Sequence, residues 1–119
     1  MAERRMFSKF VVCNDQFTSL SAGAKNLYFY LGIEADDDGF VANPVMVRRM
    51  CGAKQSDMAA LVNAGFVILF DNGLVALTHW HLHNQIRKDR YKPTVFQEEL
   101  AQLALTPSKH YQLAPTVFG

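Results

Sequence analysis

Apolar residues recur at helical spacing in three stretches of the chain. The first stretch follows Ser21, a residue type that commonly caps a helix, and its inward face consists of Ala24, Leu27, Tyr28 and Leu31. The second starts at Asn43-Pro44, an N-cap residue followed by proline at the first helical position, and stops at Gly52. The third starts two residues later and stops at Gly65. Two short helices that meet at a glycine predict a helix-turn-helix.

The two shorter helices each have an apolar side and a polar side. In the second helix the inward residues are Val47, Met50 and Cys51, and Arg48 and Arg49 face outward. In the third helix the buried face consists of Met58, Leu61 and Val62, and the outward residues include Lys54, Gln55, Ser56, Asp57, Ala59 and Asn63. We expect the common core to hold Leu27, Leu31, Leu61, Val62 and Ile68.

A β-hairpin follows the third helix. Residues 66–70 and 74–78 are β-type runs, and Asp71-Asn72-Gly73 joins them. Asn-Gly favours a tight hairpin turn because both residues tolerate positive φ. With a short strand at Phe40-Val41, the order of elements predicts an α+β winged helix-turn-helix: a three-helix core, a short strand and a hairpin wing.

Two further segments flank this unit. Residues 1–20 form an N-terminal arm in which Phe10-Val11-Val12 is expected to be extended. Residues 21–93 form the winged-helix domain. Residues 94–119 form a C-terminal helix and a flexible tail: Thr94 and Gln97 make a capping box, Phe96, Leu100 and Leu103 line the helix, and the tail is loose from Thr106 onward.

Composition fits a single soluble domain. Half of the 119 residues are hydrophobic, and no apolar run approaches the roughly 20 residues that span a membrane. The N-terminus lacks the apolar region of a signal peptide, so we expect an intracellular protein without membrane contact, and Cys13 and Cys51 as reduced thiols. The net charge of +1 excludes a uniformly basic surface but allows local patches.

Candidate catalytic or metal chemistry is weak. His79, His81 and His83 alternate and would share one face of a strand, which suits zinc, yet no further ligand motif accompanies them. The acidic run at residues 36–38 predicts a turn, and the position of the bidentate glutamate of a calcium loop is occupied by Val45. Without a phosphate loop, nucleophile elbow or Cys/His dyad, we expect no enzyme activity, no cofactor and no metal site.

The segment at residues 86–92 is the most function-like feature. It holds four of the twelve Lys and Arg residues beside a tyrosine, which suits contacts with DNA phosphates; the alternative is a solvated linker. The outward side of the third helix offers amides that pair with adenine but no arginine for guanine, and the alternative is a helix that binds a protein. The expected DNA-binding residues are Arg48, Arg49, Lys54, Gln55, Asn63, Arg87, Lys88, Arg90 and Lys92.

Four stretches, residues 5–9, 27–32, 35–41 and 83–94, resemble the N-terminal domain of phage and prophage replication proteins. These are replisome organisers related to the DnaD-type primosomal proteins. The resemblance covers about residues 4–100, and residues 83–94 are its most specific part. It implies a winged helix that binds double-stranded origin DNA or a primosome partner such as the helicase loader, in the cytoplasm of a bacterial host. Lys54 stands where the family opens the recognition helix with a serine-like cap.

Three expectations remain open. In the family a C-terminal helical domain often follows and helps to recruit the helicase loader; here the sequence stops at Gly119, so the chain is a fragment or a short variant. We expect a homodimer that forms through the N-terminal arm. The rival functions are a transcriptional regulator on the same scaffold and a self-association or protein-interaction module that binds no DNA; near-neutral charge and a weakly basic recognition helix favour the latter.

Overall fold

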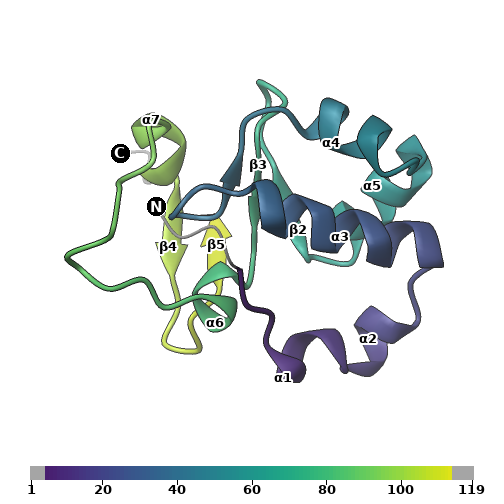
Figure 1. The fold of residues 1–119 in the computed structure, drawn as a ribbon, viewed down its shortest axis with the longest axis horizontal. Coiled ribbons are helices and arrows are strands. Elements are labelled where there is room, and N and C mark those ends of the chain that lie inside the picture. The colour runs from purple at the N-terminus through teal and green to yellow at the C-terminus, as the bar shows by residue number, and fades with distance from the viewer. Residues whose placement is uncertain (1–4, 114–119) are drawn as a thin grey trace, which may run out of the picture.

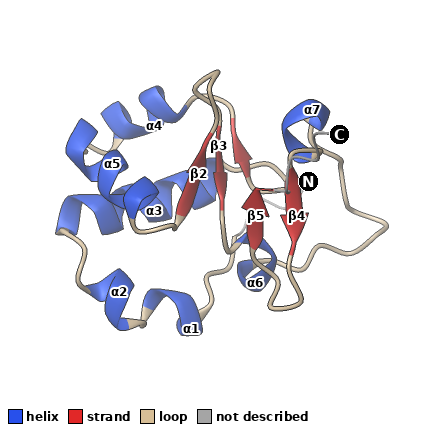
Figure 2. Ribbon diagram, turned by 180° about the vertical axis from the view of Figure 1, so that it is seen from behind, coloured by secondary structure: helices blue, strands red, loops and turns tan. Residues whose placement is uncertain are grey.

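Residues 22–77 contain the elements that the apolar pattern predicts. In the computed structural model, which describes residues 5–113, their order is α3 (Ala22–Glu34), β1 (Phe40–Val41), α4 (Pro44–Met50), α5 (Gln55–Asn63), β2 (Val67–Leu69) and β3 (Val75–Leu77). The flanking elements are α1 (Lys9–Val12), α2 (Asp15–Thr18), α6 (Trp80–His83), α7 (Gln97–Leu100), β4 (Leu103–Leu105) and β5 (Tyr111–Leu113). The described residues form a mixed α+β fold with seven helices and two small antiparallel sheets (Figures 1 and 2). Among them, no helix has the length and apolar character needed to cross a membrane.

The central helix α3 begins as expected and forms the middle of the core. The Ser21 hydroxyl oxygen accepts the Ala24 N–H at 3.1 Å, which satisfies one free donor of the first turn. Leu27, Leu31 and Leu61 are fully buried, as predicted. Val62 and Ile68 are only partly buried and pack against the edge of the same cluster.

The helices α4 and α5 meet at Gly52, whose φ of 74° lies in the left-handed region that glycine adopts without strain. Val47 faces the core, whereas Met50 is 56% exposed, which corrects the expectation that it faces inward. At about 100° per residue Met50 lies about 60° around the helix from Val47. On a helix of two turns, that offset is enough to leave the side chain in solvent.

The predicted hairpin is confirmed and forms a three-stranded sheet in the order β1-β3-β2. The Phe70 N–H donates to the Leu74 carbonyl oxygen at 2.9 Å, and the Asn72 side chain accepts the Leu74 N–H. Side chains alternate across the sheet because successive strand residues point to opposite faces. Val75 and Leu77 belong to the cluster around α3, whereas Ala76 belongs to a second cluster behind the sheet.

The second face of the sheet is covered by the C-terminal part of the chain. Phe40, Phe70, Leu74 and Ala76 pack there against Phe96, Leu100 and Leu103. The expected C-terminal helix is reduced to the single turn of α7. Part of the expected loose tail instead forms the β4–β5 hairpin, in which the buried Tyr111 donates its N–H to the Thr78 carbonyl oxygen at 2.7 Å. This correction has a physical reason: an apolar sheet face must be covered. The last residues of the expected tail, 114–119, lie outside the described residues.

The capping box expected at Thr94 is also corrected. The helix α7 begins after Phe96, and the Thr94 hydroxyl oxygen accepts the Phe96 N–H at 3.2 Å. The Gln97 side chain donates to the Thr94 carbonyl oxygen at 2.7 Å instead of accepting a backbone N–H. The pair therefore shapes the turn before the helix.

The N-terminal segment is helical and packs on the core, which corrects the extended run expected at residues 10–12. The N–H groups of Val11 and Val12 both donate to the Ser8 carbonyl oxygen at 3.1 Å. Val11 and Phe17 are buried, and the Phe17 ring lies 5.1 Å from that of Tyr28. A helix lets the adjacent Val11 and Val12 both pack against the core while Phe10 stays 77% exposed, whereas a strand would point these two valines to opposite faces.

Candidate nucleic-acid interface

The basic segment forms a long loop between α6 and α7, at the far side of the sheet from α4 and α5 (Figure 1). Its first anchor is Asn84, which is 8% exposed. The Asn84 side chain accepts the Met6 N–H at 2.9 Å and donates to the Met6 carbonyl oxygen at 3.3 Å. These two bonds pair the start of the loop with the N-terminal segment.

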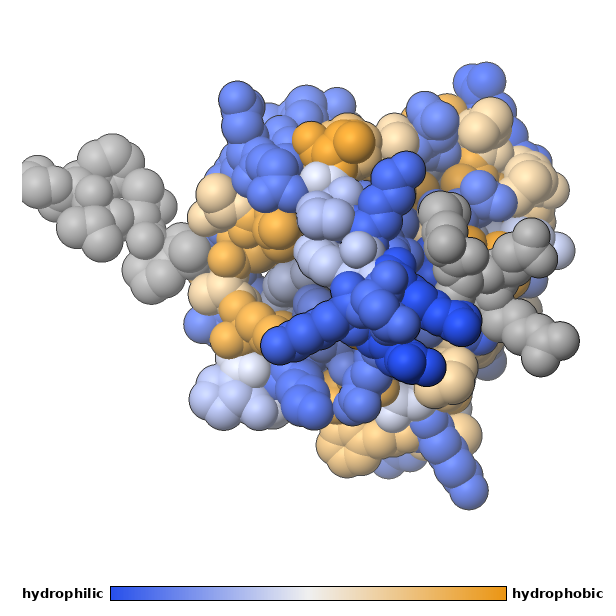
Figure 3. Space-filling view, turned by 60° about the vertical axis from the view of Figure 1, so that its left-hand side comes forward, coloured by the Kyte–Doolittle hydropathy of each residue, from blue (hydrophilic) through white to orange (hydrophobic). Residues whose placement is uncertain are grey.

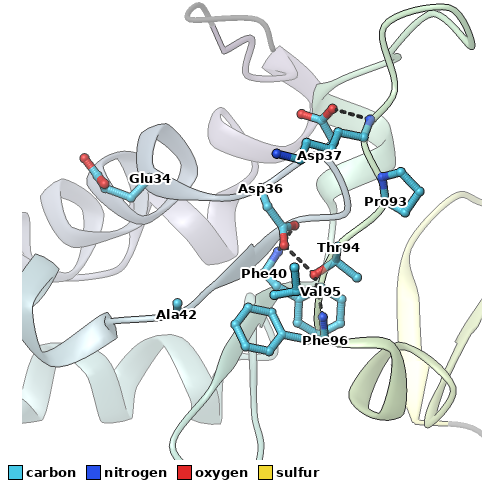
Figure 4. A pocket seen from close by; sticks show the side chains of 10 residues that line it. Glu34, Asp36, Asp37, Phe40, Ala42, Pro93, Thr94, Val95 and Phe96 are labelled. Atoms are coloured by element: carbon cyan, nitrogen blue, oxygen red, sulfur yellow. Dashed lines mark hydrogen bonds between the residues drawn. The ribbon is translucent and has the colours of Figure 1, made fainter.

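The second anchor is the acidic turn at residues 36–38, which holds the returning end of the loop (Figure 4). Asp37 accepts the Lys92 N–H at 2.9 Å. Asp38 accepts the Thr94 N–H at 2.8 Å, and Asp36 accepts the Thr94 hydroxyl. The sequence predicts a turn at these residues but does not reveal that their carboxylates hold the basic segment. The hydrogen-bonded residues are more than fifty positions apart and therefore leave no local pattern.

The turn is itself held rigidly by the core. The indole N–H of Trp80 donates to the Asp37 carbonyl oxygen at 2.9 Å, and Gly39, with φ of 88°, lies so close to Trp80 that a Cβ would approach the ring within 2.6 Å. Arg5 lies 3.6 Å from the Asp37 carboxylate and donates to the Ala35 carbonyl oxygen. The carboxylates therefore occupy fixed positions beneath the loop.

Tyr91 adds a further bond at the returning end. Its hydroxyl donates to the Asp38 carboxylate at 2.7–2.8 Å. Burial, together with this hydrogen bond and the nearby aspartates, raises the pKa of Tyr91 to about 12, so the hydroxyl stays protonated and remains a donor. The hydroxyl of Tyr91 therefore holds the returning end of the loop on the acidic turn, while the residue stays 40% exposed.

The cations of the loop lie between these two anchors. Arg87, Lys88, Asp89 and Arg90 are exposed, and the Arg90 N–H donates to the Arg87 carbonyl oxygen at 2.9 Å, which closes a turn at the tip. Arg87 and Asp89 form an ion pair of 3.3 Å that is open to solvent and of small energetic weight. In Figure 3, where this side of the molecule comes forward, the most hydrophilic surface gathers near the middle of the face. The structure thus keeps Arg87, Lys88, Arg90 and Lys92 together on one loop.

The other expected DNA-binding residues form a separate group on α4 and α5. Arg49, Lys54, Gln55 and Asn63 are exposed, but Arg48 is partly buried and donates to the Ala53 carbonyl oxygen at 3.0 Å, across the turn between the helices. The expectation that Arg48 faces outward is therefore only half right. Figures 1 and 2 place this group and the loop at opposite ends of the molecule.

Lys54 is the N-cap residue of α5 without an accepting side chain of its own. The Asp57 carboxylate accepts the Lys54 N–H at 2.8 Å and the Ser21 hydroxyl at 2.9 Å. The backbone hydrogen bond from Lys54 and the bond from Ser21 lower the pKa of Asp57. Asp57 thus secures the start of α5 to α3, and the Lys54 ammonium forms no ion pair with any residue from 5 to 113.

The histidines do not share a strand face, which corrects that expectation. His79 precedes α6, His81 and His83 lie within it, and the helical period separates their side chains. His81 contacts the Tyr111 hydroxyl at 2.9 Å, and His83 is buried beside Tyr28. Within residues 5–113 no group of three or more His, Cys, Asp or Glu side chains is arranged to hold a metal ion.

The chain was compared with family models, curated proteins and solved structures. No family model matches the chain, and searches of curated proteins and of solved structures gave no significant match.

Proposed function

We propose that this chain is the DNA-binding domain of a phage-type replication initiation protein, a replisome organiser, and that residues 21–93 form its winged-helix domain. The order α3-β1-α4-α5-β2-β3 and the sheet order β1-β3-β2 support the fold. In this assignment α4 and α5 are the helix-turn-helix and the β2–β3 hairpin is the wing.

The observation that carries DNA binding is the anchored basic loop. Its exposed tip has three cations and one carboxylate, and Lys92 follows at its base. Arg and Lys side chains neutralise DNA phosphates and release counterions. Asn84 and the acidic turn already hold both ends of the loop. Binding to DNA therefore costs less backbone entropy than it would for a free linker. A solvated linker needs no such anchors.

The role in replication rests on the family resemblance. Two of its stretches, residues 35–41 and 83–94, bond to one another through the acidic turn, so they behave as one structural unit. A transcriptional regulator would share the scaffold, and the resemblance favours the replication protein. Double-stranded DNA and primosome proteins are the proposed partners, with no catalysis and no cofactor.

Salt dependence of binding to random duplex DNA tests the DNA-binding role. The double variant Lys88→Ala/Arg90→Ala removes two free loop cations, so the log–log slope should become shallower by about 0.9 for each lost contact. Affinity should fall alike for random and origin-like sequences, because phosphate contacts carry no sequence information. The matched control, Lys9→Ala/Lys25→Ala, removes two cations of the N-terminal half and should leave the slope unchanged. Unchanged affinity in a folded loop variant would contradict the proposal.

A protein-interaction role is the second candidate, and the surface of α4 favours it. Three large apolar side chains of this helix, Val45, Met46 and Met50, are each more than half exposed. DNA phosphates gain nothing from such side chains, whereas a protein partner would bury them.

A further inference from the structure

A groove runs between α4 and the β2–β3 hairpin. One hollow of about 290 Å³ is lined by Pro44, Val45, Arg48, Arg49, Gln55, Met58, Leu69, Gly73 and Val75. A neighbouring hollow of about 550 Å³ extends along α4 to Asn43, Met46 and Asn72. The two hollows share Pro44, Val45, Arg49 and Gly73, so we treat them as one continuous depression, the α4 groove.

The α4 groove exposes apolar side chains that the fold does not use. Val45 is 53% exposed, Met46 58% and Leu69 52%. Single exposed apolar residues are ordinary, but these three line one depression, which is typical of a binding surface. Methionine is flexible and polarisable, so Met46 and Met58 can adapt to a partner's side chains.

The charged residues that line the α4 groove all have the same sign. They are Arg48 and Arg49, and no Asp or Glu lines either hollow. The bond to the Ala53 carbonyl oxygen fixes Arg48 and leaves its other guanidinium N–H groups available, and Arg49 has no ion pair within residues 5–113. A partner that fits this surface is apolar and bears carboxylates.

Side chains of neighbouring elements make the floor. Leu69 and Val75 are directly paired across β2 and β3, and Pro44 and Met58 complete the lining from the helices. A partner that fills the α4 groove therefore packs its side chains onto this floor. An amphipathic helix laid into a groove makes contacts of this kind.

We propose that the α4 groove binds an acidic amphipathic helix of a partner protein, with its apolar side against Val45, Met46 and Leu69 and its carboxylates on Arg48 and Arg49. In Figure 1, α4 and the loop between α6 and α7 lie on different sides of the β1-β3-β2 sheet. The α4 groove is therefore independent of DNA binding by the loop and could be occupied together with it.

Fluorescence anisotropy with a labelled model peptide tests the proposal. The probe is a helical peptide of about fifteen residues, with leucines at positions i, i+3, i+4 and i+7 and glutamates beside them. The matched peptide carries lysine in place of every glutamate. We expect the acidic peptide to bind the full chain about tenfold more tightly than the basic one, a difference that attraction to two arginines readily supplies.

Two single substitutions locate the binding surface. Arg49→Glu and Met46→Glu should each weaken binding of the acidic peptide by about tenfold, because one reverses a charge and the other places a carboxylate among the apolar side chains of the groove. Both side chains are exposed, so the thermal midpoint should not change. The control Val95→Glu alters another apolar side chain, 81% exposed and outside the groove, and should bind as the unaltered protein does.

Each other outcome overturns the proposal. Equal binding by the Arg49→Glu variant, or no binding of the acidic peptide, would mean that the groove takes no acidic helix. Duplex DNA that displaces the peptide and itself requires Arg49 would assign the surface to DNA, and self-association lost in Met46→Glu would assign it to a second copy. The Lys88→Ala/Arg90→Ala variant keeps the two hypotheses apart: it should lose DNA affinity and bind the peptide normally.

Discussion

His83 joins three segments of the chain through one buried imidazole. A backbone N–H can only donate, so the 2.7 Å contact with the Ser8 N–H makes Nδ1 an acceptor. In the neutral ring Nε2 then carries the proton and donates to the Tyr28 hydroxyl oxygen at 2.5 Å. Burial, with a smaller contribution from the charge of His79, lowers the pKa of His83 to about 4. A second proton would remove the acceptor for Ser8.

This histidine makes stability depend on pH. Its pKa rises from about 4 in the folded chain to 6.5 in the unfolded chain, so between these values the unfolded chain binds more protons. The contribution of His83 to stability should be full above pH 6.5, fall as the pH drops toward 4 and then level off. Urea unfolding across this range should show a smaller loss in His83→Gln, which has no proton to gain. Burial lowers the pKa of His79 and His81 too, so part of the loss should remain. An identical pH profile in both proteins would contradict this role.

Leu31 contributes more to stability than the residues on the exposed side of α3. It is fully buried, so Leu31→Ala should lower the free energy of unfolding by about 2–5 kcal/mol through lost burial and the cavity left behind. Ile33 lies on the same helix but is 53% exposed, so Ile33→Ala should cost much less. Chemical denaturation measures both. A loss below about 1 kcal/mol for Leu31→Ala would mean that the inward face of α3 is wrongly assigned.

At the scale of elements, local signals account for what the sequence predicts well. Ser21, Pro44 at the first turn of α4 and the Asn72-Gly73 turn each act within a few residues, so α3, α4 and the β2–β3 hairpin could be placed from the chain alone, although the Asn43 side chain makes no capping hydrogen bond. The β4–β5 hairpin could not, because it forms against a sheet face that exists only after folding. The helix α1 is similar: contact of both Val11 and Val12 with the core decides between helix and strand.

The candidate site likewise combines features that are local in the sequence with contacts that are long-range. The clustering of cations at residues 86–92 is visible in the sequence, and their exposure follows from ordinary solvation. What the sequence does not reveal is the support from the aspartates at 36–38, a long-range arrangement whose residues look like a common turn. It also does not reveal that the loop and the helices α4 and α5 lie apart, since that depends on the path of the chain behind the sheet.

At the scale of the whole molecule, self-association remains a prediction, and the structure changes how it should be tested. Deleting residues 1–12 would remove the buried Val11 and the Arg5–Asp37 pair, so the deletion would confuse dissociation with unfolding. Phe10 is 77% exposed and offers a cleaner test. We expect Phe10→Ser to shift a homodimer to monomer in sedimentation velocity at an unchanged thermal midpoint. A monomer already present in the unaltered protein at high micromolar concentration would contradict the prediction.

The separation of the two cation groups leads to a last prediction about DNA. The molecule measures 39 × 38 × 27 Å, and the loop and the α4–α5 group lie at opposite ends of it, so a duplex that lies across the loop end only does not reach Arg49 and Lys54. The variant Arg49→Ala/Lys54→Ala should therefore keep the salt slope of the unaltered protein on random DNA. Combined with Lys88→Ala/Arg90→Ala, it should show the slope of the loop variant alone, because distant sites without shared partners act independently. Titration of labelled duplex over a series of salt concentrations gives all four slopes. If the α4–α5 variant instead flattens the slope by about 0.9 for each cation removed, the helices α4 and α5 contact the phosphates, and the combined variant then shows whether the loop contacts them as well.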